Sequence, residues 1–223
     1  NVVRLYSVNF FNNPKREIKK IKDLLDKLTS SKSNLSSNFK RTYRAAKMDV
    51  ATTDANGILS GNLDADLIKT IKAVVVAEEP ISSQFLIKRV LAQYGITKYG
   101  TRLEGKIASL IPACALKSQQ LLGTTHYYKN DKAIGFDKYR VEEGTSVRTN
   151  ETDFSPYDVI ALIKALLVDR VSMYRDELIL AAAAQLKSSK PNDKFSAYVS
   201  ACIDESVSEG MFIRSVSDRI SLA

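Results

Sequence analysis

The sequence predicts a mainly α-helical protein with small β-hairpins, an α+β fold built from two copies of one module. The first observation is a repeat: residues 66–121, shifted by 92 positions, overlie residues 158–213 without a gap. Asp66 then meets Asp158, and Ile71 meets Ile163. The second observation is that each copy holds three apolar runs at helical spacing, separated by Pro, Gly or Ser. One register kept through three periodic segments indicates a duplicated unit.

The first module is assigned to residues 65–148. A helix is expected from an N-cap near Asp64 to Glu79–Pro80, and a second from Ser82 or Ser83 to Gly95. Thr101 to Glu104 has the spacing of a capping box, which predicts a third helix that ends near Pro112. Two strands, 119–128 and 133–141, are expected around an Asn130–Asp131 turn. Three helices and a hairpin predict a winged helix.

The second module, residues 149–223, repeats this pattern. Ser155–Pro156 predicts a helix start, with Asp158 near the positive end of the helix dipole. The second helix is expected over 174–186, the turn over 187–193 and the third helix over 195–206. A short hairpin is expected from 211–213 and 219–222, around Ser217–Asp218. The second module is therefore predicted as a winged helix with a truncated hairpin.

A strand and a helix precede the modules. Residues 1–28 hold a short apolar strand, Val2 to Tyr6, and a basic helix that starts at Asn13–Pro14. Residues 29–64 are interpreted as a linker, in which 39–48 can form a short packed helix. A lone strand needs a sheet, so residues 1–28 are interpreted as the remnant of another domain.

Charge differs between the two modules. The chain carries 33 basic and 25 acidic residues, a net charge of +8. Residues 66–141 have a net charge of +6, whereas residues 142–223 have −4. Because summed charge governs what a surface attracts, the modules are expected to have different partners.

The first module is the candidate nucleic-acid interface. In helix-turn-helix proteins the second helix of the motif enters the major groove with its N-terminal residues first. This assigns contacts to the third helix and the loop before it, and phosphate contacts to the hairpin: Lys98, Tyr99, Thr101, Arg102, Lys106, Lys129, Lys132 and Lys138. The alternative is a protein-docking module in which Arg102 pairs with Glu104 or Asp66. With no base-reading pattern, binding is expected to be independent of sequence.

Several short motifs resemble a known family. Arg4-Leu5-Tyr6-Ser7, Phe10-Phe11, Pro14 and Glu17 are similar to the last strand and helix of a restriction-endonuclease-like domain in large bacterial superfamily I helicase-like proteins. Tyr6 and Phe10 stand where that family usually has Trp. Tyr43-Arg44-Ala45, Pro80-Ile81, Leu86, Gly95 and Gly100-Thr101-Arg102-Leu103 resemble the uncharacterised C-terminal domain of the same proteins, and the part from Ser155–Pro156 resembles their terminal α-helical repeat.

The resemblance implies a parent protein that is an ATP-dependent helicase/nuclease-like enzyme, whose upstream helicase and nuclease domains are partners in the same polypeptide. The nuclease carboxylates and lysine would lie upstream of this chain. The expected partner is DNA, and the resemblance is the source of the motor and nuclease ideas.

Catalysis by this chain is not expected. No Gly-rich phosphate loop is present, and Glu78–Glu79 and Glu142–Glu143 are interpreted as solvated charges. The lone His126 and the two cysteines, Cys114 and Cys202, give no metal-binding spacing, and both thiols are expected to be buried and free. No cofactor is expected. With no long apolar run and no leader, the expectation is a cytoplasmic protein with no membrane partner.

Three functions therefore remain open. The first is a non-catalytic accessory region of a DNA helicase/nuclease-like protein, whose first module binds nucleic acid. The second is a protein–protein or intramolecular scaffold that does not bind nucleic acid. The third is a free-standing tandem winged-helix regulator, which the lone strand at Val2 to Tyr6 argues against.

Overall fold

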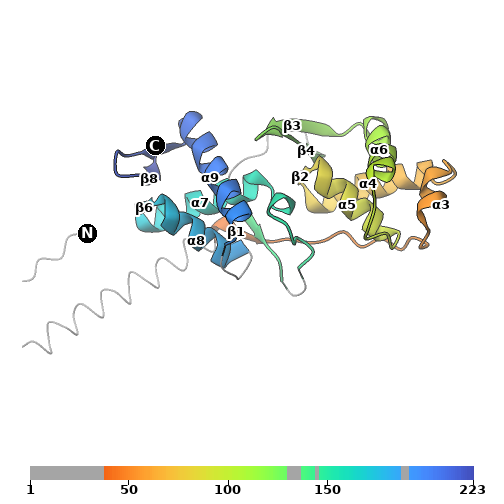
Figure 1. The fold of residues 1–223 in the computed structure, drawn as a ribbon, viewed down its shortest axis with the longest axis horizontal. Helices are drawn as coiled ribbons and strands as arrows, with labels where there is room; N and C mark the ends of the chain where they lie inside the picture. The colour runs from red at the N-terminus through yellow and green to blue at the C-terminus, as the bar shows by residue number, and fades with distance from the viewer. Residues whose placement is uncertain (1–37, 130–136, 144–145, 187–190) are drawn as a thin grey trace, which may run out of the picture.

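A computed structural model describes residues 38–129, 137–143, 146–186 and 191–223 (Figure 1). The predicted strand Val2 to Tyr6 and the helix from Asn13–Pro14 lie outside these residues. We call residues 38–129 the first half and residues 146–186 with 191–223 the second half. Figure 1 shows the halves side by side along the longest axis of the molecule.

The first half contains three main helices and a three-stranded antiparallel sheet of order β2-β4-β3. After β1 (Lys40–Thr42) and α3 (Ala55–Leu59) come α4 (Asp64–Glu78), β2 (Ile81–Ser82), α5 (Ser83–Gln93), α6 (Thr101–Leu110), the 3₁₀ turn η1 (Pro112–Cys114), β3 (Lys117–Leu121) and β4 (Thr124–Tyr128). The predicted cap at Ser82 is confirmed, since its Oγ accepts a hydrogen bond from the Phe85 amide at 3.3 Å. The predicted capping box is wrong: Gly100 is the N-cap of α6, and no side chain caps this helix.

The predicted hairpin of the first half is also wrong in place and length. β3 and β4 both lie in the stretch around 119–128 that was expected to be a single strand, and they pair from Lys117↔Tyr128 to Leu121↔Thr124. The turn is Leu122–Gly123, with φ values of 51° and 68°. Two positive φ angles are typical of a type I′ turn, which matches the twist of paired strands. The expected turn at Asn130–Asp131 and residues 133–136 of the expected second strand lie outside the described residues. Within the described part of that strand, Tyr139–Val141 forms β5, which pairs in parallel with β1 and not with β4.

The second half has the same element order. It begins with the 3₁₀ turn η2 (Glu151–Asp153), followed by α7 (Pro156–Arg170), β6 (Ser172–Tyr174), α8 (Arg175–Leu186), α9 (Asp193–Ser208), β7 (Phe212–Arg214) and β8 (Arg219–Leu222). Its sheet has the order β6-β8-β7. The helices α7, α8 and α9 each begin 92 residues after α4, α5 and α6. The offset found in the sequence thus recurs in the positions of the helices.

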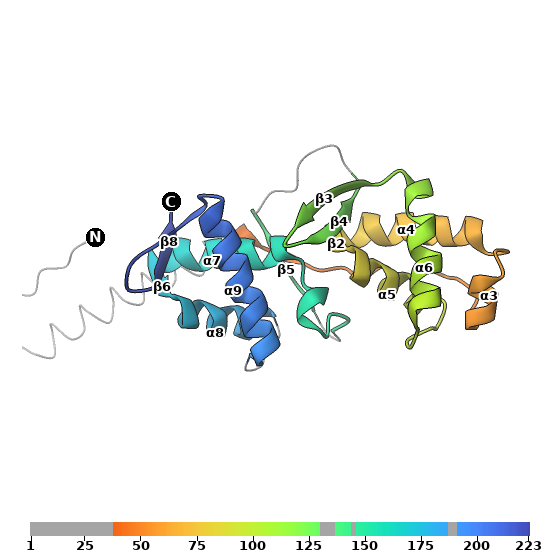
Figure 2. The same ribbon diagram turned by 45° about the horizontal axis from the view of Figure 1, so that its top comes forward.

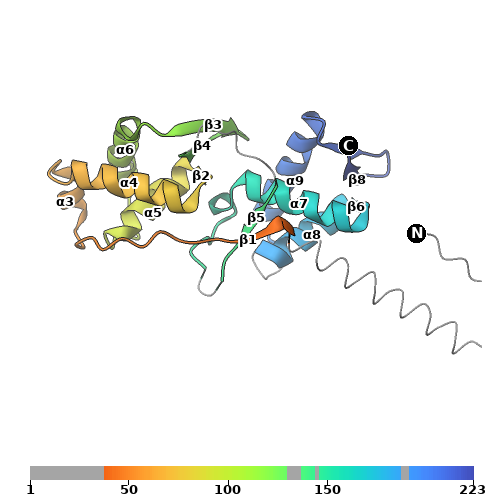
Figure 3. The same ribbon diagram turned by 180° about the vertical axis from the view of Figure 1, so that it is seen from behind.

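The segment assigned to the linker contributes to the first core. The expected helix over 39–48 is wrong: β1 is followed by irregular chain that runs along the first half to α3 (Figure 3). Tyr43, Ala46 and Ile58 are buried with the apolar faces of α4 and α5. The chain takes this path because Tyr43 and Ile58 remove apolar surface from water that α4 and α5 alone leave open.

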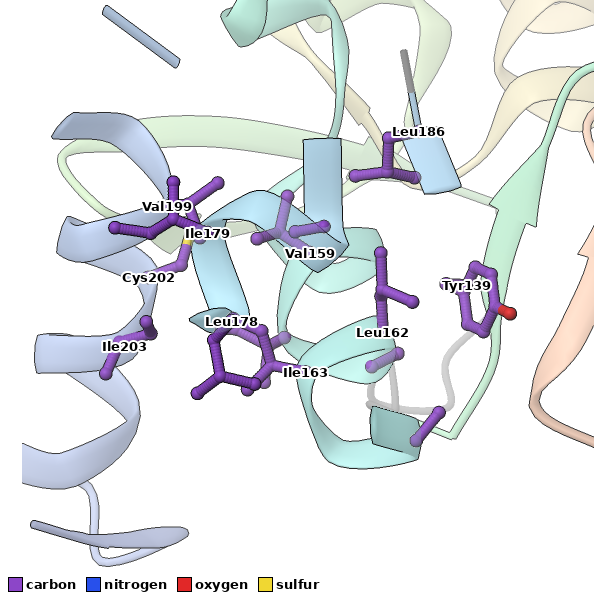
Figure 4. Packing of buried hydrophobic residues seen from close by; sticks show 14 of the residues in the cluster. Tyr139, Val159, Leu162, Ile163, Leu178, Ile179, Leu186, Val199, Cys202 and Ile203 are labelled. Carbon is purple, nitrogen blue, oxygen red and sulfur yellow. The ribbon is translucent and has the colours of Figure 1, made fainter. Parts of the chain in front are cut away.

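Each half has its own apolar core. Figure 4 shows part of the second core, where Leu178 and Ile179 of α8 meet Val199, Cys202 and Ile203 of α9. Leu121 and Tyr139 also belong to this cluster, although they precede the second half in the chain. The two cysteines are buried and free, one in each core, as expected. In the described residues, no helix is long and apolar enough to cross a membrane.

Candidate nucleic-acid interface

The N-terminal turn of α6 presents two of the predicted contact residues. Leu103 and Ile107 are buried against α4 and α5, so they fix which side of α6 faces solvent. Thr101 and Arg102 lie on the solvent side, and Lys98 is exposed in the preceding loop. Lys98, Thr101 and Arg102 are therefore all accessible to solvent at or just before the N-terminal turn of α6.

The cationic groups of Lys98 and Arg102 are not neutralised within the part of the chain that the structure describes. No ion pair involves either side chain there, and the alternative pairing of Arg102 with Glu104 or Asp66 is not formed. Asp66 instead pairs with Lys69 at 3.0 Å. Both cations are therefore available to an anionic partner.

Lys106 and Tyr99 are less available. The Lys106 ammonium forms an ion pair with Asp64 at 2.6 Å, and its side chain keeps only 19% of its accessible surface. Tyr99 is half-buried against the first core, and burial, with Glu104 and Asp153 nearby, raises the pKa of its phenol. Their contact roles stay predictions, and the structure gives both residues a packing role.

The hairpin does not extend freely into solvent. Leu121 at its tip is buried in the second core, and the His126 ring packs edge-on against Tyr157 with ring centroids 5.7 Å apart. The His126 Nδ1 lies 3.0 Å from the Thr124 carbonyl oxygen, and burial lowers the pKa of the ring. Lys129 is exposed after β4, and its backbone amide donates to Glu79 at 2.6 Å. Lys132 lies outside the described residues, and Lys138 is exposed before β5.

Sequence reasoning missed a buried polar cluster between the halves, which we call the junction: Glu78, Arg140, Arg148 and Asp158. Arg140 is at its centre, with Nε 2.8 Å and Nη2 2.6 Å from the two oxygens of Asp158. The same guanidinium donates to the carbonyl oxygens of Glu78, Glu79 and Pro80. Figure 2 shows β5, which carries Arg140, between α7 and α4.

Helix electrostatics explain the position of Arg140. The last carbonyls of α4 have no amide partner within the helix, and the C-terminal end of a helix is partially negative. Asp158 lies in the first turn of α7, at the positive end of that helix, as predicted. Burial alone lowers the pKa of Arg140, but Asp158 raises it above its ordinary value. The cation therefore links one end of α4 to the start of α7.

Arg148 extends the junction through stacking. Its guanidinium carbon lies 4.3 Å from the Tyr43 ring centroid and 4.7 Å from that of Phe154. It donates to the Arg140 carbonyl at 3.0 Å and lies 3.4 Å from Asp158. A guanidinium between two aromatic faces is an arrangement that Arg favours when its charge is removed from water. Burial lowers the pKa of Arg148.

Glu78 is the acidic residue of the first half in this cluster. It is 1% exposed and accepts hydrogen bonds from the Tyr43 hydroxyl, the Ala46 amide at 2.8 Å and Arg89 Nε at 2.9 Å. The interpretation of Glu78 as a solvated helix-end charge is therefore wrong. A buried carboxylate needs such partners because its desolvation is costly. Glu142 similarly accepts from the amides of 147 and 148, at 2.9 and 3.2 Å.

No family model, no curated protein and no solved structure matches the chain. Across the described ranges, no group of three or more His, Cys, Asp or Glu side chains has a geometry suited to a metal ion. The exposed cations near α6 and the junction are therefore the two features of the described chain that bear on function.

Proposed function

We propose that this chain is a non-catalytic accessory region that binds nucleic acid through α6 and the loop before it, without strong sequence preference. The observation that carries the proposal is the exposed pair Lys98 and Arg102, which lack ion-pair partners in the described chain, at the start of an amphipathic helix. In this proposal each half is a winged-helix-like unit, and the parent is a DNA helicase/nuclease-like protein, as the sequence resemblance implies.

The order of elements supports a winged-helix reading. In the first half a helix, a short strand, two helices and a hairpin follow one another, and the short strand joins the hairpin as a third strand. The α5–α6 pair then corresponds to a helix-turn-helix, with α6 as the helix that approaches nucleic acid. Since the hairpin packs on the second half, α6 is the principal contact in this proposal.

The exposed residues of α6 are mostly small, which suits the close approach of a nucleic-acid backbone. Thr101, Gly105, Ala108 and Ser109 are exposed, together with one long cationic side chain, Arg102, and one carboxylate, Glu104. An added Cβ at Gly105 would meet no atom within 4 Å. Gly100 provides no side-chain cap, so the first amides of α6 can donate to a phosphate. These features favour contact with a backbone rather than reading of base edges.

Fluorescence anisotropy of labelled duplex DNA at two salt concentrations tests the proposal. Because binding rests on phosphate contacts, the affinity should fall steeply with salt. The double variant Lys98→Ala/Arg102→Ala should weaken binding and reduce the salt slope by about two, one for each lost phosphate contact. The matched control is Arg170→Ala/Lys194→Ala, which removes two exposed cations from the second half. Equal weakening by both variants, or no binding at low salt, contradicts the proposal.

A second candidate function is an intramolecular or protein–protein scaffold. The junction favours it, because Arg140 and Asp158 are 4% and 1% exposed and hold the two halves together. The net charge of −4 over residues 142–223 also disfavours a nucleic-acid role for the second half. The absence of binding at low salt in the titration above would leave this function as the better account.

A further inference from the structure

A cavity lies beside the N-terminal turn of α6. It has a volume of about 260 Å³ and is lined by Gln84 and Ile87 of α5, Tyr99, Glu104 of α6, and Asn150 from the chain before η2. Pockets for drug-sized ligands span roughly 300–1,000 Å³, so this one suits a smaller group. Lys98 directly precedes Tyr99, and Arg102 shares the first turn of α6 with Glu104. Neither cation lines the cavity, but each lies within two residues of a residue that does.

The polar groups of the cavity select against an anion. Lys88 also lines it, but its ammonium is held by Asp153 at 2.6 Å and by Thr149 at 3.1 Å. The Glu104 carboxylate is exposed, and in the described residues it forms no ion pair. The Tyr99 phenol is protonated at neutral pH, since its ordinary pKa is about 10 and burial raises the pKa further. The remaining groups favour a planar ligand with N–H donors.

We propose that this cavity takes one unstacked nucleobase of a single strand whose phosphates contact Lys98 and Arg102, an inference that rests on the proposed function. Tyr99 contributes an aromatic side chain to the lining of the cavity and Ile87 an apolar one, and unpaired bases stack on aromatic side chains. The Glu104 carboxylate accepts from an exocyclic amine, as acidic side chains do from cytosine N4. A base with that amine is therefore favoured over thymine, which lacks it.

Anisotropy titrations with oligo-dC and oligo-dT of equal length, near neutral pH, test this inference on the full chain. Oligo-dC should bind about ten-fold more tightly than oligo-dT, because one hydrogen bond to a charged group changes the affinity by about this factor. Glu104→Gln should abolish the difference between the two strands, whatever its effect on overall affinity. Tyr99→Leu, which keeps an apolar side chain at this half-buried position, should weaken oligo-dC about five-fold or more. Tyr174→Leu in the second half is the matched aromatic control.

The outcomes separate this inference from the proposed function. If the chain binds neither duplex nor single strands, the proposed function fails and the inference fails with it. If Lys98→Ala/Arg102→Ala weakens binding to both forms while oligo-dC and oligo-dT bind equally, the interface stands and the base pocket is refuted. An abasic strand of the same length should lose the binding that the pocket adds, and equal affinity for that strand also overturns the pocket.

Discussion

Arg140→Ala is the change that should harm this protein most. The guanidinium bridges Asp158 of α7 and the carbonyls at and just after the end of α4, and Arg140 is only 4% exposed. Removal of the guanidinium leaves the Asp158 carboxylate, which is 1% exposed, with Arg148 at 3.4 Å as its remaining cationic partner. It also leaves the carbonyls of Glu79 and Pro80 without this donor.

The expected loss is large because one partner of a buried pair is removed and the other stays behind. Such changes cost about 3–5 kcal/mol, a large share of the roughly 5–15 kcal/mol that holds a domain folded. For a chain of this length, 1 kcal/mol corresponds to a shift of about 2–4 °C in Tm. The midpoint of thermal unfolding should therefore fall by roughly 6–20 °C.

Differential scanning calorimetry measures this shift and the cooperativity of unfolding. The wild-type halves should unfold together, and Arg140→Ala should separate them into two transitions because the junction no longer couples them. Lys69→Ala is the control: its ion pair with Asp66 is 75% and 56% exposed, so its loss should lower Tm by less than about 2 °C. A fall for Arg140→Ala as small as that of the control would refute the junction as the link between the halves.

Three further predictions concern single sites. Burial lowers the pKa of His126 below 6.5, so the unfolded chain binds a proton at higher pH than the folded one. The free energy of unfolding should therefore fall as pH drops below about 6.5. Urea titrations at several pH values should show a weaker pH dependence of this free energy for His126→Gln, and an equal pH dependence in the wild type and the variant contradicts the prediction. Gly105→Ala should raise Tm by a few degrees, since Gly costs about 0.5–1 kcal/mol inside a helix, whereas Gly61→Ala, at φ +85°, should lower it. Cys114 and Cys202 should react with Ellman's reagent only after unfolding, because burial raises the pKa of both thiols; fast reaction of the native chain contradicts this.

Local signals in the sequence predicted the helices well. Ser155–Pro156 starts α7 because a capping hydroxyl and a residue without an N–H both suit a first turn. The hairpin was misplaced because its turn, Leu122–Gly123, lacks the Asn or Asp that marks such turns, whereas Asn130–Asp131 has it. In the structure β3 pairs with β4 across Leu122–Gly123, so the stretch that was predicted as one strand forms both strands of the hairpin.

In the candidate site, too, the sequence predicts the local features and does not predict the long-range contacts. The exposure of Arg102 follows from the helical period of α6, which can be read from the sequence, and Lys98 lies in the polar loop before that helix. The partner of Lys106 could not, because Asp64 is 42 residues away. Arg140 is 60 residues from the carbonyl of Pro80. Partner choice over such distances depends on how the two halves pack, and no local pattern encodes it.

The two copies of one acidic position show how the halves diverged. Asp66 is exposed and pairs with Lys69 one turn away, whereas its equivalent Asp158 is buried and pairs with Arg140. A buried carboxylate is tolerated only with such a partner, so the second copy can use this position to attach to the rest of the chain.

The same pairing lowers the charge that the first half can offer. The net charge of +6 over residues 66–141 counts Arg89 and Arg140, which are held by Glu78 and Asp158, and Lys88, which is held by Asp153. The cations at the α6 edge are thus fewer than composition implies. Because affinity for phosphates scales with the number of cations that reach them, binding should be weak, at about 10⁻⁴–10⁻⁶ M near physiological salt. Nanomolar affinity for duplex DNA would mean that contacts outside the α6 edge dominate.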